Sequence, residues 1–158
     1  AKHVRGQMFA LAYLIETGVF SGHKPDDIQT WIAEGESLLR QTGRLPHFAY
    51  AKALVWQQIG LGVLSQYGSD LQKGLSACEN AVMLGKRIGH HPLVVNALTV
   101  AAHAHVLAGE YDQARKRLHA AHNLGHHNRF PEYGALRSLA EFHLALIGAQ
   151  LATATEWL

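Results

Sequence analysis

The sequence predicts an all-α chain of one domain, built as a stack of helical hairpins. Apolar residues recur at spacings of three and four along nearly the whole chain, and almost no stretch alternates as a half-buried strand does. Glycines and prolines divide this pattern into segments of helix length joined by short connections. Small and large apolar residues also return at a regular interval, which indicates an internal repeat.

The composition limits the classes of protein to consider. A chain of 158 residues can bury a core without disulfides, and 48% apolar against 16% charged residues excludes a disordered chain. The formal charge of +2 does not by itself indicate nucleic-acid binding. The single cysteine, Cys78, cannot form an internal disulfide and is expected to be buried.

Other features bear on location and completeness. No stretch approaches the roughly 20 apolar residues of a membrane span, and no export signal is visible, so a cytoplasmic protein is expected. The chain begins at Ala1 without a methionine and ends inside an apparent helix. We therefore expect it to be a fragment of a longer protein.

The turn signals predict eight helices in four hairpins. The helices are expected near residues 3–17, 25–41, 47–67, 70–88, 92–108, 111–126, 131–147 and from 150 onward, and the hairpins near 3–41, 47–88, 92–126 and 131–158. Pro25 and Pro92 fit first turns, where a proline loses no hydrogen bond, and Asp70 fits a helix N-cap. The left-handed conformation that ends a helix is expected at Gly18, Gly43, Gly89 and Gly109.

A repeat is visible in the small residues. Glycines at 18, 68, 109 and 148 are predicted to end the first helix of each hairpin, and the last two spacings are 41 and 39 residues. The motif Trp56-x2-Ile59-Gly60-x2-Val63 matches Leu136-x2-Leu139-Ala140-x2-His143, and Leu98-x2-Ala101-Ala102 leads into Gly109-Glu110-Tyr111-Asp112-Gln113-Ala114. Gly60 and Ala140 are expected where paired helices touch.

These motifs resemble the tetratricopeptide (TPR) pattern, W-x2-L-G-x2-Y followed by G-x-Y-x2-A. The resemblance implies an α-α superhelix, a TPR-like solenoid whose first helices line a concave groove. The repeat length near 40 and the ending Gly148-Ala149-Gln150-Leu151-Ala152-Thr153-Ala154-Thr155-Glu156-Trp157-Leu158 are similar to the sensor region of MalT-type, ATP-dependent LuxR-family transcription regulators. That similarity implies a domain that binds a small-molecule effector or a protein partner, with nucleotide-binding and DNA-binding domains outside these residues. The alternative is a general TPR protein–protein interaction scaffold not tied to transcription.

The TPR register places six mostly polar residues on the concave wall, among apolar neighbours. They are Gln57, Asn96, Thr99, His103, Arg137 and Glu141. A few hydrogen-bonding groups among apolar residues suit an effector or an extended peptide. Arg137 can pair with a ligand carboxylate or phosphate, or with Glu141 one turn later.

Other chemistries have weaker support. His119, His122 and His126 share one helix face, which leaves open either a metal site or a solvated polar face, and Arg115-Lys116-Arg117 leaves open either a phosphate site or a solvated face. His90-His91 is interpreted as part of a loop, and His103 and His105 are expected to face different ways. No nucleophile–base spacing or phosphate-binding loop is visible, so neither an enzyme nor a cofactor is expected. Apolar terminal helices without polar caps predict a homodimer through an end.

Overall fold

The computed structural model describes residues 2–43, 45–65, 70–127, 145 and 148–149. These residues form helices and connections, with no strand among them, so the all-α prediction is confirmed for this part of the chain. The elements are α1 (Lys2–Ser21), α2 (Pro25–Thr42), η1 (Pro46–Phe48), α3 (Ala49–Leu64), α4 (Leu71–Arg87), α5 (His91–Leu107) and α6 (Tyr111–His127). The helices expected near 131–147 and from 150 onward lie almost wholly outside the described residues, and so does the fourth hairpin.

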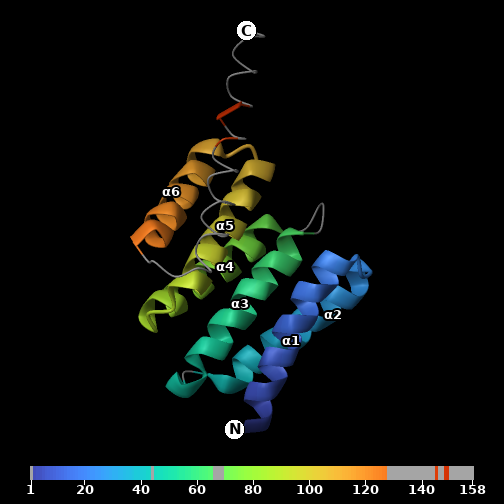
Figure 1. The fold of residues 1–158 in the computed structure, drawn as a ribbon. Coiled ribbons are helices and arrows are strands. Elements are labelled where there is room, and N and C mark those ends of the chain that lie inside the picture. Colours follow the sequence, from blue (N-terminus) through green and yellow to red (C-terminus); the bar gives the residue numbers. More distant parts are fainter. Residues whose placement is uncertain (1, 44, 66–69, 128–144, 146–147, 150–158) are drawn as a thin grey trace.

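The six helices form three hairpins, α1/α2, α3/α4 and α5/α6, that follow one another from one end of the molecule to the other (Figure 1). Helix α3 also packs against α1 and against α5, so the first helices of the hairpins form one layer. Ion pairs link the second helices. Lys73 Nζ of α4 lies 2.8 Å from Glu36 Oε1 of α2, and Arg117 of α6 pairs with Glu79 of α4.

Most predicted helix boundaries are observed, with the expected chemistry. Pro25 lies in the first turn of α2, and the Asp70 carboxylate accepts a hydrogen bond from the Lys73 backbone N–H at 3.0 Å at the start of α4. Gly43, Gly89 and Gly109 have φ angles of 49°, 68° and 75°, in the left-handed region.

The predicted end of the first helix is wrong. Helix α1 continues through Gly18 to Ser21, and the left-handed glycine is Gly22, with φ of 72°. Gly18 is buried inside the helix because Trp31 of α2 packs there, and a Cβ atom at Gly18 would lie 2.5 Å from the Trp31 ring. Gly148 is also helical rather than a turn residue. Of the four glycines assigned to the repeat, only Gly109 has the expected role among the described residues.

Several contacts between helices occur at glycines. A Cβ atom on Gly60 of α3 would lie 2.5 Å from Cys78 Sγ and 3.3 Å from the Gly74 carbonyl oxygen of α4. A Cβ atom on Gly74 would in turn lie 2.5 Å from the Leu64 side chain. Between α4 and α5, Gly85 meets Val94 in the same way, at 2.7 Å. The expectation that Gly60 lies where paired helices touch is confirmed.

The core is divided among the hairpins. One cluster of buried residues joins α1, α2 and α3 and includes Ile15, Ile32 and Ile59, and a second joins α3, α4, α5 and α6 around Val94 and Val95. The half-buried side chains of Leu54 and Trp56 contact both clusters. Buried apolar area of this kind contributes about 25 cal/mol per Å², whereas partly exposed ion pairs contribute about 1 kcal/mol at most. Apolar contact between neighbouring hairpins therefore holds the stack together.

Replacing Gly60 with Leu should destabilise the fold by at least about 1–3 kcal/mol, because the new side chain must separate α3 from α4. Chemical denaturation followed by circular dichroism measures this loss. Gly6→Ala is the matched control, since a Cβ atom at Gly6 meets nothing within 4 Å and an exposed helical alanine is favoured over glycine by about 0.5–1 kcal/mol. Unchanged stability of the Gly60→Leu chain would contradict the close contact.

Candidate binding face

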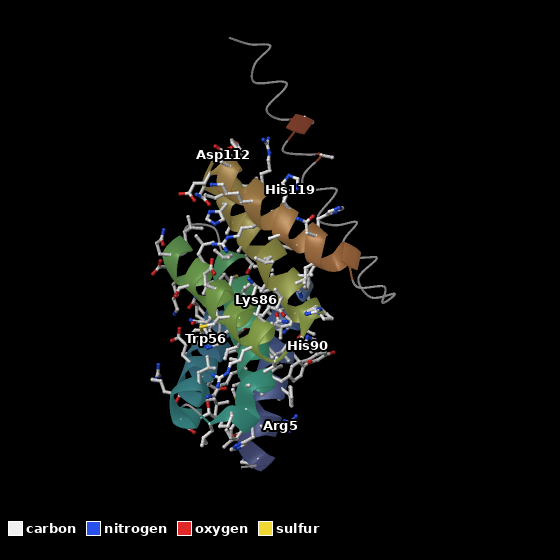
Figure 2. All side chains as sticks on the ribbon, turned by 90° about the vertical axis from the view of Figure 1, so that its left-hand side faces the viewer. Arg5, Trp56, Lys86, His90, Asp112 and His119 are labelled. Atoms are coloured by element: carbon white, nitrogen blue, oxygen red, sulfur yellow. The ribbon has the colours of Figure 1, made fainter. Side chains whose placement is uncertain are left out.

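A row of side chains on the first-helix layer crosses all three hairpins. The guanidinium carbon of Arg5 lies 5.6 Å from the centre of the Phe9 ring on α1. The Phe9 ring lies 5.9 Å from that of Tyr50 at the start of α3, and the Tyr50 ring lies 4.9 Å from that of His90, which precedes α5. We call Arg5, Phe9, Tyr50 and His90 the ring row. Figure 2 labels its two ends, Arg5 and His90, far from Asp112 and His119 of α6.

Each member of the ring row is held in place by its own element. Arg5 and Phe9 are one turn apart on α1 and so share a face. Tyr50 follows η1, which the buried side chain of Phe48 fixes against the first cluster. His90 is the N-cap of α5, where its Nδ1 accepts a hydrogen bond from the Leu93 backbone N–H at 3.3 Å. The rings are therefore positioned before any ligand arrives.

The ring row combines apolar and polar groups. Arg5 and Tyr50 are exposed, and Phe9 and His90 are half-buried. Aromatic contacts of this kind contribute about 0.5–1.5 kcal/mol each, which orders the rings. The guanidinium and phenol groups can donate hydrogen bonds to a ligand that lies against the rings. Such a surface can bind an extended peptide or a flat organic ligand.

A stripe along α3 continues from the ring row. Tyr50, Leu54, Gln58 and Leu61 follow at helical spacing and share one side of the helix. Gln58 is 2% exposed, and its side-chain oxygen has no hydrogen-bond donor among the described residues. A buried acceptor without a donor costs about 1–3 kcal/mol, so this oxygen favours a donor from outside.

The residues predicted for the concave wall are only partly brought together. On α5, Asn96 is half-buried and His103 is exposed, while Thr99 is buried and donates its hydroxyl hydrogen bond to the Val95 carbonyl oxygen at 2.9 Å. Gln57 is buried, on the side of α3 that carries Gly60 and faces α4. Gln58, the next residue along α3, is buried as well. Arg137 and Glu141 lie outside the described residues.

Sequence reasoning missed the ring row. The spacing of Arg5 and Phe9 on one helix face was a usable signal, but the contacts of Tyr50 join separate elements and leave no trace in residue spacing. His90 lies in the connection before α5, as interpreted, but its side chain caps α5 and packs against Tyr50, while His91 is the first residue of α5.

The histidines on α5 and α6 are dispersed. His103 is exposed and His105 is buried, so the two face different ways as predicted. His105 Nδ1 lies 2.7 Å from Glu110 Oε2, which ties the end of α5 to the start of α6. In the predicted stripe, His119 is exposed and His122 half-buried, and the His126 side chain lies outside the described residues. Among the described residues, no three potential ligands are grouped so that they could hold a metal ion.

One contact resembles a nucleophile–base pair. Ser21 Oγ lies 2.9 Å from His23 Nδ1 at the end of α1. The same hydroxyl donates to the Thr17 carbonyl oxygen, so its single proton is directed at the backbone and away from the imidazole. This pair closes the end of α1.

Burial shifts the pKa of two side chains. It raises the pKa of the Cys78 thiol to about 12. The Glu79 carboxylate adds to this rise in pKa, and the Arg117 guanidinium opposes it. It lowers the pKa of Lys52, whose ammonium group donates to the carbonyl oxygens of Thr42 and Gly43 at the end of α2. Both groups serve the packing of the helices, since Cys78 lies under Gly60 and Lys52 joins α3 to α2.

Comparisons with known proteins identify no family. No family model matches the chain, and no curated protein or solved structure matches it either. None of the described helices is both long enough and apolar enough to cross a membrane.

The Cys78 thiol should not react with a thiol reagent in the folded chain at neutral pH, because it is buried and its pKa is raised to about 12. Absorbance on addition of Ellman's reagent measures this, and one equivalent should react once the chain is unfolded in guanidinium chloride. Rapid reaction of the native chain would contradict the burial of this thiol beneath Gly60.

Proposed function

We propose that this chain is a TPR-like binding module that holds an extended peptide or a small organic effector against the ring row. The observation that carries the proposal is the alignment of Arg5, Phe9, Tyr50 and His90 across three hairpins. A ligand lying along this row contacts every described hairpin at once.

The neighbouring polar groups support the same proposal. The unpaired acceptor of Gln58 lies on the α3 stripe that begins at Tyr50, and Asn96 and His103 occupy the next first helix of the layer. Rings supply apolar area, and these groups supply directional hydrogen bonds, which together orient a bound molecule.

The narrower proposal is that the module is the sensor region of a MalT-type LuxR-family regulator in the cytoplasm. Its support is the sequence resemblance, together with three stacked hairpins that neighbouring contacts hold in place. A ligand that contacts several hairpins favours one arrangement of them, and flanking nucleotide-binding and DNA-binding domains would respond to that shift. The general interaction scaffold is the alternative proposal. A phosphate-binding loop encoded upstream and a helix-turn-helix downstream would favour the sensor, and their absence would favour the scaffold.

Thermal-shift screening of the chain against sugars, nucleotides and short peptides should find a ligand that raises its Tm. Tyr50→Ala should then weaken binding of that ligand about tenfold or more, because losing the central ring removes at least about 1.4 kcal/mol of contact. Isothermal titration calorimetry measures the change in Kd.

Two variants control this experiment. Tyr50→Phe keeps the ring and should bind nearly as well as the native chain, and Met83→Ala removes an exposed apolar side chain from α4 and should leave Kd unchanged. Binding that survives Tyr50→Ala intact would place the ligand elsewhere and refute the proposed site.

A further inference from the structure

The ring row contains one charged group, the Arg5 guanidinium, and no described carboxylate pairs with it. The guanidinium carbon lies 5.6 Å from the centre of the Phe9 ring, so that ring occupies one face of the group. The ion pairs among the described residues join α2 to α4, α4 to α6, and α5 to the connection before α6. The N–H groups along the edge of the exposed Arg5 guanidinium are therefore available to a ligand.

Carboxylates are scarce on the layer that carries the ring row. Helices α1, α3 and α5 together contain one, that of Glu16. Glu16 lies about three helical turns beyond Arg5 on α1, or roughly 16 Å along the helix. Helix α2 alone, among the second helices, carries four carboxylates. A negatively charged ligand is thus complementary in charge to the Arg5 end of the row and meets no like charge on the same layer nearby.

The other end of the row offers little to an anion. His90 Nδ1 accepts the Leu93 backbone N–H at 3.3 Å, and the His90 carbonyl oxygen accepts that of Val94 at 3.3 Å. Pro92 has no N–H, so the first turn of α5 keeps few of the donors that usually bind anions at a helix start. The negative charge of a ligand therefore belongs beside Arg5.

Between the two ends, the geometry of the rings favours a further ring. The planes of Phe9 and Tyr50 are inclined at 49°, and those of Tyr50 and His90 at 42°. A flat ring stacked on Tyr50 is consequently inclined to its other neighbours, and aromatic rings prefer offset-stacked and inclined contacts to face-to-face ones. Tyr50 is 37% exposed, so part of its ring is accessible to such a partner.

We propose that the ring row binds an aromatic monocarboxylate, a flat ring with one carboxylate on a short side chain. The ligand's ring lies against Tyr50 and Phe9, and its carboxylate accepts two parallel hydrogen bonds from the Arg5 guanidinium. The 5.9 Å between the Phe9 and Tyr50 ring centres keeps both contacts within the length of one small molecule. This inference rests on the proposed function and names the chemical class of the ligand at the same site.

A single arginine suits a carboxylate better than a phosphate. Phosphate groups are usually held by several cations or by a helix N-terminus. Here the one cation of α3, Lys52, donates to the carbonyl oxygens of Thr42 and Gly43, and α5 contains no lysine or arginine. The planar guanidinium group of Arg5 matches the two oxygens of one carboxylate.

NMR titration of the chain with 2-naphthylacetate tests the proposal, at up to about 10 mM because ligands of this size bind weakly. The neutral analogue of the same shape, 2-naphthylacetamide, should bind at least fivefold more weakly. The decahydro analogue keeps the carboxylate but has no aromatic ring, and it should also bind at least fivefold more weakly.

Two variants test the role of Arg5. Arg5→Gln should bind the acid no more tightly than the amide, because the counter-charge is gone. The matched control, Arg40→Gln, removes the same charge from an exposed position of α2 and should leave the preference for the acid unchanged. The ratio of the two dissociation constants is the readout, so a general loss of affinity does not imitate the expected result.

Several outcomes would overturn the inference. Equal binding of the acid and the amide by the native chain would exclude the contact between the carboxylate and Arg5, and equal binding of the decahydro analogue would exclude the aromatic class. Tighter binding of 2-naphthyl phosphate would assign a phosphate ligand instead. If 2-naphthylacetate does not bind but screening finds a peptide or sugar whose binding depends on Tyr50, the ligand class is wrong and the proposed function stands. If no ligand depends on Tyr50, both are wrong.

Discussion

The close approach of α3 to α4 is the constraint on which the rest of the structure depends. Gly60 leaves room for the Cys78 side chain and for the backbone at Gly74, and Gly74 leaves room for Leu64. Helix α3 also packs against α1 and against α5. The buried clusters on either side of α3 share Leu54 and Trp56, so the position of this one helix determines both junctions between hairpins.

The candidate binding face follows from the same helix. Lys52 donates to the two carbonyl oxygens that end α2, which fixes the first turn of α3 against the first hairpin. Burial lowers the pKa of this ammonium group, and the carbonyl oxygens of a helix end partly offset that cost. Tyr50 lies about half a helical turn from Lys52 on α3. The hydrogen bonds of Lys52 at the end of α2 therefore also position Tyr50, the central ring of the ring row.

The sequence predicted the helical class and most helix boundaries, because periodicity and capping residues act locally: Asp70 caps α4 and Gly109 ends α5 as expected. The prediction failed at Gly18, because the residue type alone does not distinguish a glycine that leaves room for the Trp31 ring inside a helix from one that ends a helix. Gln57, expected on the concave wall, is buried, because α3 packs against α1, α4 and α5 and helical spacing alone does not show which of its sides other helices cover. The contact between Tyr50 and His90 was not predicted, because a contact between distant elements is a property of packing.

The ring row has a mechanical consequence. Phe9, Tyr50 and His90 belong to three successive hairpins, so hinge movement at either junction alters the distance between neighbouring rings. A ligand that requires one fixed distance between neighbouring rings would hold both junctions in one conformation. The relative orientation of the described hairpins at the two ends of the row would then change together, without any change inside a single helix.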